Sequence, residues 1–171
     1  TAIKIAKKEN EKNKNLDFLN SDAENFSFSK KFDIVTCQYA LFFFPNAQKA
    51  LKNIKNSLKK SGMIGISVHG SNDNVPFFSS ILDSATKYIP DYIPPGTPNL
   101  DRFGTKSALR TEVRKAGFTN IVTKEFIFNY SPGKFEDYWN NYIKYIAKPL
   151  KEKLNGLEYS KRKEFKESVK E

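Results

Sequence analysis

Two short apolar runs joined by an amphipathic segment constrain the fold of this chain more than any other feature. The runs cover residues 32–37 and 63–68 and are rich in β-branched side chains, which favour strands. The segment between them has apolar residues at helical spacing, namely Ala47, Leu51, Ile54 and Leu58. A strand, a helix and a second strand in so short a stretch predict a parallel β-α-β crossover.

The carboxyl ends of the two predicted strands are where chemistry is expected. Open parallel sheets bind ligands beyond these ends, in the crevice that the connecting loops form. The residues there are Cys37, Gln38 and Tyr39 after the first strand and His69 after the second. The sequence therefore predicts a ligand site around these side chains.

Length and composition set the broad class of the protein. The 171 residues suit a single domain over 1–171, and 15 Phe and 8 Tyr supply material for a core. No apolar run reaches the roughly 20 residues of a membrane span. The single Cys excludes an internal disulfide framework. With no signal peptide visible, a cytoplasmic location is expected.

The formal net charge of +10 raises the question of a nucleic-acid partner. Nearly all the basic residues are Lys, and they are scattered over helix faces among many Asn. Arg is the residue suited to bidentate contacts with bases and phosphates, and the chain has few: Arg102, Arg110, Arg114 and Arg162. Contact with a nucleic acid stays open, but a solvated basic surface is favoured.

The first half of the chain shows further local signals. Residues 16–19 read as a short strand, and 20–31 as a loop. Asn46 is a suitable N-cap for the crossover helix because its side chain can accept a backbone N–H. Gly62 is expected to end that helix in the left-handed conformation.

The second half reads as helices around one more strand. A helix is expected over 76–88, and another after Thr105 that ends at Gly117. Residues 119–130 read as a long strand, and 134–171 as a C-terminal helical segment. The stretch 89–104 is rich in Pro and Gly, so it is expected to be a loop: either a lid or a plain surface excursion. The aromatic residues from Phe135 onward either dock that helix on the domain or line a hydrophobic pocket.

Common catalytic constellations are absent from the sequence. One His and one Cys cannot form a zinc site of the usual spacing, so no metal is expected. Neither a P-loop nor a G-x-G-x-x-G motif occurs. A Cys in a buried strand usually acts as a small hydrophobe, which disfavours Cys37 as a nucleophile. His69 is either a general base or a partly exposed loop residue.

The ordered set of these motifs resembles a class I S-adenosylmethionine-dependent methyltransferase. The set comprises S-D-A-E-N-F, F-D-I-V-T-C-Q-Y-A-L-F-F-F-P-N, L-K-K-S-G and R-K-A-G-F-T-N-I. Within that superfamily it is similar to the group around the ubiquinone and menaquinone biosynthesis enzymes, over residues 1–130. The resemblance implies an α/β fold, a Rossmann-like open and mostly parallel sheet flanked by helices. The first two strands are expected to be missing, and the sheet is expected to be incomplete at the C-terminus as well.

The resemblance also implies roles for particular residues. Asp22 matches the acidic residue that accepts a hydrogen bond from the adenine amino group of the cofactor, and the Ala23 N–H meets an adenine ring nitrogen. Cys37, Gln38 and Tyr39 match the strand end beside the methyl donor. His69 lies where relatives often place an aromatic residue facing the substrate. No residue here matches the glycine-rich turn or the ribose-binding carboxylate.

The expected function is methyl transfer from S-adenosylmethionine to a small-molecule acceptor. The alternatives are a methyltransferase acting on RNA or protein, which the charge favours, and a non-catalytic methyltransferase-like scaffold. The chain starts with Thr and stops in a charged helical pattern, which suggests an internal piece of a longer protein. These 171 residues alone are therefore expected to bind the cofactor weakly or not at all. The acceptor atom and the oligomeric state are left open.

Overall fold

The contacts within the chain divide it into two compact units. The computed structural model describes residues 2–93, 99–146 and 148–171. The first unit comprises Thr1–Ser67 with Thr111–Ile121, and the second comprises Val68–Arg110 with Val122–Glu171. The single partial domain expected over residues 1–171 stays a prediction.

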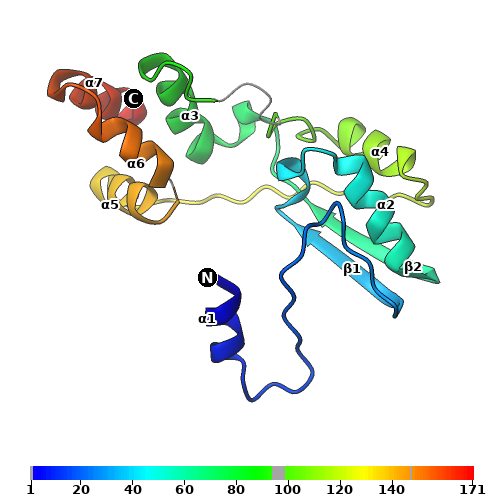
Figure 1. The fold of residues 1–171 in the computed structure, drawn as a ribbon. Coiled ribbons are helices and arrows are strands. Elements are labelled where there is room, and N and C mark those ends of the chain that lie inside the picture. The colour runs from blue at the N-terminus through cyan, green and yellow to red at the C-terminus, as the bar shows by residue number, and fades with distance from the viewer. Residues whose placement is uncertain (1, 94–98, 147) are drawn as a thin grey trace. The chain divides into compact units, whose positions relative to one another are not determined.

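A parallel strand pair with a covering helix forms the centre of the first unit. β1 (Phe32–Gln38) pairs in parallel with β2 (Leu58–Ser67), and α2 (Ala47–Ser57) connects them (Figure 1). Residues alternate along β1, so that Cys37 is buried while Ile34 and Thr36 are exposed on the opposite face. The buried residues of α2 are Ala47, Ala50, Leu51, Ile54 and Ser57. The predicted crossover and the α/β class are confirmed.

The start of α2 was predicted correctly, but its end was not. The Asn46 side chain accepts a hydrogen bond from the Lys49 N–H at 2.9 Å, as a capping residue does. The helix then stops at Ser57, and β2 begins at Leu58 instead of residue 63.

Gly62 has a role different from the predicted helix cap. Phe32 pairs with Leu58 but Ile34 pairs with Met63, so residues 59–62 form an irregularity in the ladder. A Cβ atom on Gly62 would lie 3.0 Å from the Phe32 carbonyl oxygen. This glycine therefore permits a close approach of two strands.

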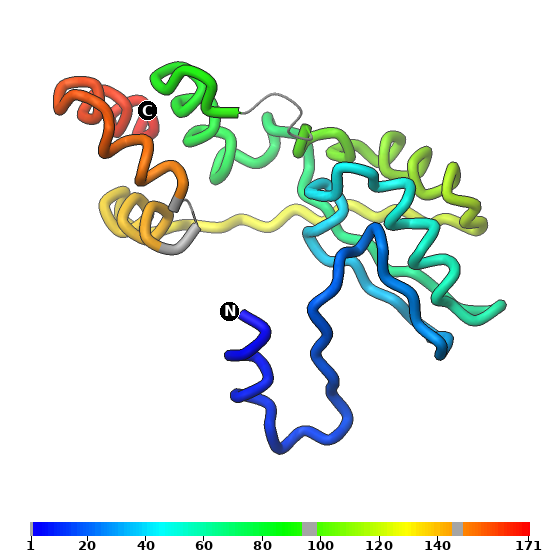
Figure 2. Tube along the Cα trace, in the orientation of Figure 1, coloured from blue at the N-terminus to red at the C-terminus, as the bar shows by residue number. Residues whose placement is uncertain are grey.

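The two other strands expected from the sequence do not form. Residues 16–19 have no strand structure, and Leu19 is 64% exposed. Residues 119–130 also lack a ladder partner, and they run as an extended trace (Figure 2). A strand needs a neighbour to pair its backbone N–H and C=O groups, and the described residues supply none for either segment. Both segments have the composition of a strand but not the partner.

Two shorter helical elements belong to the first unit, and a third begins in the second unit and ends in the first. α1 (Ala2–Glu9) has no buried residue, and the 3₁₀ turn η1 (Leu41–Phe43) buries Leu41 and Phe42. α4 (Lys106–Lys115) is capped as predicted, because the Thr105 hydroxyl accepts from the Ala108 N–H at 3.1 Å.

Gly117 ends α4 in the left-handed conformation, with a φ of 89°. The Gly117 N–H donates to the Arg114 carbonyl at 2.8 Å, and the Phe118 N–H to the Val113 carbonyl at 3.4 Å. The Lys55 ammonium donates to the Gly117 carbonyl at 2.6 Å. The end of α4 is thus tied to α2 within the first unit.

The second unit is helical. Its elements are η2 (Asn72–Asn74), α3 (Pro76–Tyr88), α5 (Phe135–Asn141), the π-helix η3 (Tyr142–Ile146), α6 (Lys148–Asn155) and α7 (Tyr159–Lys170). The core joins α3, α6 and α7 through Ile81, Ala85, Ile89, Leu150, Leu154, Phe165 and Val169. The helix predicted over 76–88 is confirmed. Part of the predicted lid over 89–104, residues 94–98, lies outside the described residues.

Tyrosine side chains pack against this core and are partly desolvated. Burial, and to a lesser extent the neighbouring Tyr142, raises the pKa of Tyr138 to about 12. Burial and the neighbouring Tyr92 raise the pKa of Tyr142 to about 12. Both phenols are therefore neutral hydrogen-bond donors at physiological pH.

The Gly117→Ala substitution is expected to destabilise the protein by about 1–2 kcal/mol, because a side chain disfavours the left-handed conformation. The added methyl group would also meet the Lys55 side chain. Gly65→Ala is the matched control, since the nearest atom to its Cβ would be the Thr36 methyl carbon at 3.7 Å. Urea denaturation measures both variants. An equal free energy of unfolding for the two would contradict the strained cap.

The second unit is expected to lose stability in alkali. The folded pKa of Tyr142 lies above the unfolded value of 10.0. Its contribution is therefore complete below pH 10 and is lost as the pH rises through about 12. Thermal unfolding of the parent and of Tyr142→Phe between neutral pH and pH 12 tests this. The variant should lose less stability than the parent over that range; parallel losses in both proteins would show that this phenol does not titrate as described.

Candidate functional site

The carboxyl ends of β1 and β2 meet in a strained turn. Tyr39 has a φ of 48°, which is uncommon for a residue with a side chain. Its N–H donates to the Ser67 carbonyl at 2.9 Å and so extends the parallel ladder by one residue. The Tyr39 side chain is 49% exposed, and Gln38 is exposed as well. Strained backbone of this kind clusters at functional sites, so this turn is a candidate for ligand contact.

Ser67 adds a polar atom that the sequence did not single out. It pairs with Gln38 in the ladder, so both side chains lie on one face of the sheet. Its hydroxyl is buried and has no hydrogen-bond partner among the described residues. A buried hydroxyl without a partner costs free energy, so a ligand that bonds to it would be favoured. No motif marks this serine in the sequence.

Cys37 lies at the same strand end but is not suited to nucleophilic attack. Burial raises the pKa of its thiol, and the backbone N–H groups of Leu41 and Ala40 offset this only in part. A thiol is a much weaker nucleophile than a thiolate. Cys37 therefore contributes shape and packing to the strand end.

The loop before β1 forms a tight turn around the Asp22 carboxylate. One carboxylate oxygen accepts from the Glu24 N–H at 2.9 Å, and the other accepts from the Asn25 side chain. The Glu24 N–H, then the Asn25 amide and to a lesser extent Lys49, lower the pKa of Asp22. The carboxylate is exposed and ionised, and two of its roughly four acceptor positions are used.

Ala23 offers the complementary donor. Among the residues described, its backbone N–H has no hydrogen-bond partner, whereas its carbonyl accepts from the Asn53 side chain at 3.3 Å. The turn therefore presents an anionic acceptor and a backbone donor on adjacent residues. That pair complements a flat heterocycle with a donor and an acceptor on one edge.

Three contacts hold this turn against α2. The Glu24 carboxylate accepts from the Asn46 N–H at 2.7 Å. The Lys49 ammonium donates to the Asn25 side-chain oxygen at 2.6 Å, and Asn53 holds the Ala23 carbonyl. An anionic side chain at a helix N-terminus is also favoured by the helix dipole. We refer to these three contacts as the α2 clasp.

The structure brings most of the predicted site residues into one unit. The turn of Asp22 and Ala23 is held to α2 through Glu24, Asn25 and the Ala23 carbonyl. Cys37, Gln38 and Tyr39 precede that same helix, with η1 between them. The loop residues Glu24 and Asn25, which carry the clasp, were not assigned a role from the sequence. Only the acidic-amide composition of the loop could have pointed to them.

His69 belongs to the second unit. Its Nδ1 lies 2.7 Å from the Gly70 carbonyl oxygen, which favours a proton on Nδ1 and the lone pair of the neutral ring on Nε2. The imidazole is half-buried, and its ring lies 6.5 Å from that of Phe78.

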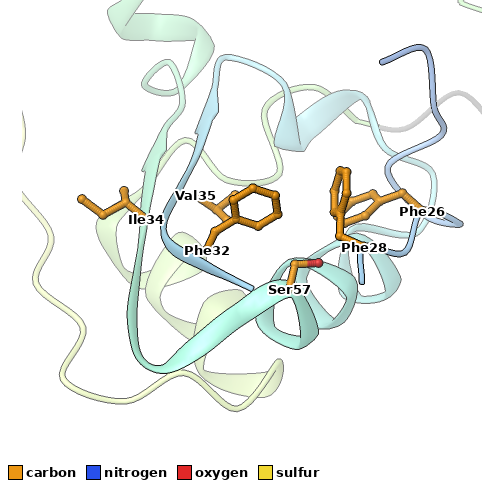
Figure 3. A pocket seen from close by; sticks show the side chains of 6 residues that line it. All are labelled: Phe26, Phe28, Phe32, Ile34, Val35 and Ser57. Carbon is orange, nitrogen blue, oxygen red and sulfur yellow. The ribbon is translucent and has the colours of Figure 1, made fainter. Parts of the chain in front are cut away.

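An apolar hollow of about 240 Å³ opens at the other end of the strand (Figure 3). Its lining consists of Phe26, Phe28, Phe32, Ile34, Val35 and Ser57. Phe32 and Ile34 lie at the amino end of β1, so the hollow is separate from the strand-end site. It contains none of the residues predicted to bind a ligand.

The described residues contain neither a candidate metal-binding cluster nor a candidate membrane-spanning helix. No group of three or more His, Cys, Asp or Glu side chains there could hold a metal ion. In the same part of the chain, no helix is both long and apolar enough to cross a membrane.

The parallel crossover and the strand-end site define an incomplete Rossmann-like α/β fold. Residues 1–66 match a family model described as a methyltransferase domain. A ubiquinone biosynthesis O-methyltransferase from Glaesserella parasuis serovar 5 (strain SH0165) is 29% identical over 114 residues. These residues are 66% of this chain and 45% of the relative, so the chain spans about half the relative's length. The resemblance to class I S-adenosylmethionine-dependent methyltransferases is thereby confirmed, and the family match covers residues 1–66.

Removing the Glu24 carboxylate is expected to loosen the α2 clasp. Glu24→Ala leaves the Asn46 N–H without its acceptor, so hydrogen exchange at that amide should accelerate roughly tenfold. Glu11→Ala removes an exposed carboxylate outside the clasp and serves as the control. Amide exchange followed by NMR measures both. Unchanged exchange at Asn46 in Glu24→Ala would mean that the contact does not order the helix start.

Proposed function

We propose that this protein transfers a methyl group from S-adenosylmethionine to a small-molecule acceptor. The observation that carries the proposal is the Asp22–Ala23 turn held by the α2 clasp. It lies within the residues that match the methyltransferase domain. The turn presents the acceptor and the donor that an adenine edge requires. It is bonded to α2, the crossover helix that follows the end of β1.

The adenosine part of the cofactor is assigned to the turn. The Asp22 carboxylate accepts a hydrogen bond from the adenine amino group, and the Ala23 N–H donates to a ring nitrogen. Support comes from the lowered pKa of Asp22, which keeps the carboxylate ionised, and from the unused acceptor positions on it. The clasp fixes both groups before binding, which reduces the entropy lost in the complex.

The methyl-donating end is assigned to the strand ends. Cys37 contributes shape and packing to the end of β1, while Gln38 and Tyr39 contact the cofactor or the acceptor. Two observations support this assignment: the strained φ of Tyr39, and the buried hydroxyl of Ser67, which has no hydrogen-bond partner among the residues that the structure describes. Holding donor and acceptor in line is the main requirement of methyl transfer.

His69 is assigned the role of general base. The acceptor is an oxygen nucleophile, in keeping with the O-methyltransferase named above. As the new C–O bond forms, the C–S bond breaks and its electron pair stays on sulfur. The acceptor hydroxyl loses its proton to Nε2 of His69. The contact between Nδ1 and the Gly70 carbonyl supports this tautomer.

A methyltransferase acting on RNA is the second candidate. The net charge of +10 favours it. Binding to RNA that weakens steeply with salt would support this candidate. Weak binding with a shallow salt dependence would support a small acceptor.

For the location of the protein, we propose the cytoplasm, since a reducing compartment suits the buried free thiol of Cys37.

Asp22→Asn is expected to weaken S-adenosylmethionine binding about tenfold in the complete gene product, since the amide replaces one acceptor oxygen with a donor. The control is Asp17→Asn, which alters an exposed Asp of the preceding segment. Calorimetry with S-adenosylmethionine measures both variants and the parent. Equal affinities for Asp22→Asn and the parent would remove Asp22 from the adenine site. No binding by the parent would overturn the proposed function itself.

A further inference from the structure

The peptide between Gly70 and Ser71 connects His69 to another segment of the second unit. Its carbonyl oxygen lies 2.7 Å from Nδ1 of His69. Because a peptide bond is planar and nearly rigid, contacts that fix the Ser71 nitrogen also fix this oxygen. The Ser71 carbonyl accepts from the Asn74 N–H at 2.8 Å, and the Ser71 hydroxyl accepts from the Asn74 side chain at 3.0 Å. The loop that follows His69 is therefore ordered by its own hydrogen bonds.

The end of the stretch rich in Pro and Gly forms a folded turn, residues 99–104. The Asn99 side chain accepts from the Asp101 N–H at 2.9 Å, and the Gly104 N–H donates to the Asp101 carbonyl at 2.9 Å. Phe103 is buried and anchors the turn. This part of the stretch is thus packed on the second unit, to which it and His69 both belong.

Gly104 brings the turn against the Gly70–Ser71 peptide. A Cβ atom on Gly104 would lie 2.7 Å from the Ser71 nitrogen and 2.9 Å from the Ser71 Cα, closer than such atoms approach without a bond. The two backbones can therefore meet only because residue 104 has no side chain. The same point lies 2.9 Å from Oδ1 of Asp101. A peptide nitrogen and a carboxylate oxygen thus border one small space between the two segments.

Two polar groups at this contact have no hydrogen-bond partner among the residues that the structure describes. One is the buried Oδ1 of Asp101, and the other is the Ser71 N–H. A negative oxygen beside a peptide nitrogen is favourable, since the N–H end of the peptide dipole is positive. It also polarises the peptide, so that the carbonyl oxygen at the other end becomes a stronger hydrogen-bond acceptor.

We propose that Gly104 and Asp101 are positioning residues for the His69 ring. Gly104 lets the turn hold the adjoining peptide in place, and the Asp101 carboxylate strengthens the acceptor at the carbonyl end of that peptide. Both effects keep the proton of the neutral imidazole on Nδ1 and its lone pair on Nε2. The use of this lone pair in proton transfer rests on the proposed function. The orientation of the ring does not, since it needs neither cofactor nor acceptor.

Nitrogen NMR of the neutral imidazole measures the tautomer, because protonated and unprotonated ring nitrogens have well-separated chemical shifts. The complete gene product is labelled with isotope-enriched histidine and studied in alkaline buffer, and the His69→Gln variant assigns the signals. In the parent, the Nδ1–H tautomer is expected to be the major one. Gly104→Ala and Asp101→Asn should each lower the ratio of Nδ1–H to Nε2–H about threefold to tenfold, by weakening the bond to the Gly70 carbonyl.

Gly156→Ala and Asp73→Asn are the matched controls in the same unit. A Cβ atom on Gly156 would lie 3.4 Å from the Lys153 carbonyl oxygen, an ordinary contact, and Asp73 is exposed on η2. Neither substitution should change the tautomer ratio. Asp101→Asn keeps the volume of the side chain, so it tests the proposal even where Gly104→Ala does not fold.

A parent whose neutral His69 ring is mainly Nε2–H would overturn the proposal. Equal ratios in Asp101→Asn and Asp73→Asn would remove the role of Asp101, and equal ratios in Gly104→Ala and Gly156→Ala would remove that of Gly104. The expected ratios together with absent S-adenosylmethionine binding would keep the positioning of the ring and remove the proposed methyl transfer.

Discussion

The packing of α2 on the parallel strand pair is the interaction on which the first unit depends. The helix buries Ala50 and Leu51 completely, and Leu41 of the preceding turn is buried with them. Removing side chains of this size from a core typically costs about 2–5 kcal/mol. Because α2 is fixed in this way, it is a stable support to which a polar loop can be bonded.

The candidate adenine turn is held in place by its hydrogen bonds to this helix and its N-cap. Glu24, Asn25 and the Ala23 carbonyl are each bonded to α2, at Asn46, Lys49 and Asn53 respectively. The Asp22 carboxylate is oriented in turn by the Glu24 N–H. Hydrophobic packing thus positions a helix, the helix positions a loop, and the loop presents the groups that we assign to the cofactor.

The elements that could be predicted from the sequence are those whose signals are local. The strand pair, the Asn46 cap and the end of α4 at Gly117 all follow from side-chain chemistry within a few residues, and all are present. The strands expected over 16–19 and 119–130 are not, because a strand also requires a partner. Gly62 was misread for a similar reason: its role comes from the Phe32 carbonyl of another strand.

The residues of the candidate site also divide into those that local sequence predicts and those that depend on distant contacts. Asp22, Ala23 and the residues at the end of β1 could be selected by their order along the chain, because the family motif is a linear pattern. Ser67 and the α2 clasp could not, since a buried hydroxyl and contacts between residues 22 or more positions apart leave no mark in the linear sequence. In the second unit, the hydrogen bond from the Tyr138 hydroxyl to the Phe77 carbonyl likewise joins residues 61 positions apart.

The proposed function depends on adenine binding at the Asp22–Ala23 turn. Its most direct test is an NMR measurement on the complete gene product with isotope-labelled backbone amides, titrated with S-adenosylhomocysteine. We expect nuclear Overhauser contacts between the adenine protons and the Ala23 amide, with the Tyr39 amide shifting in the same titration. Contacts of the adenine protons with other residues, and an unshifted Ala23 amide in the saturated complex, would contradict it.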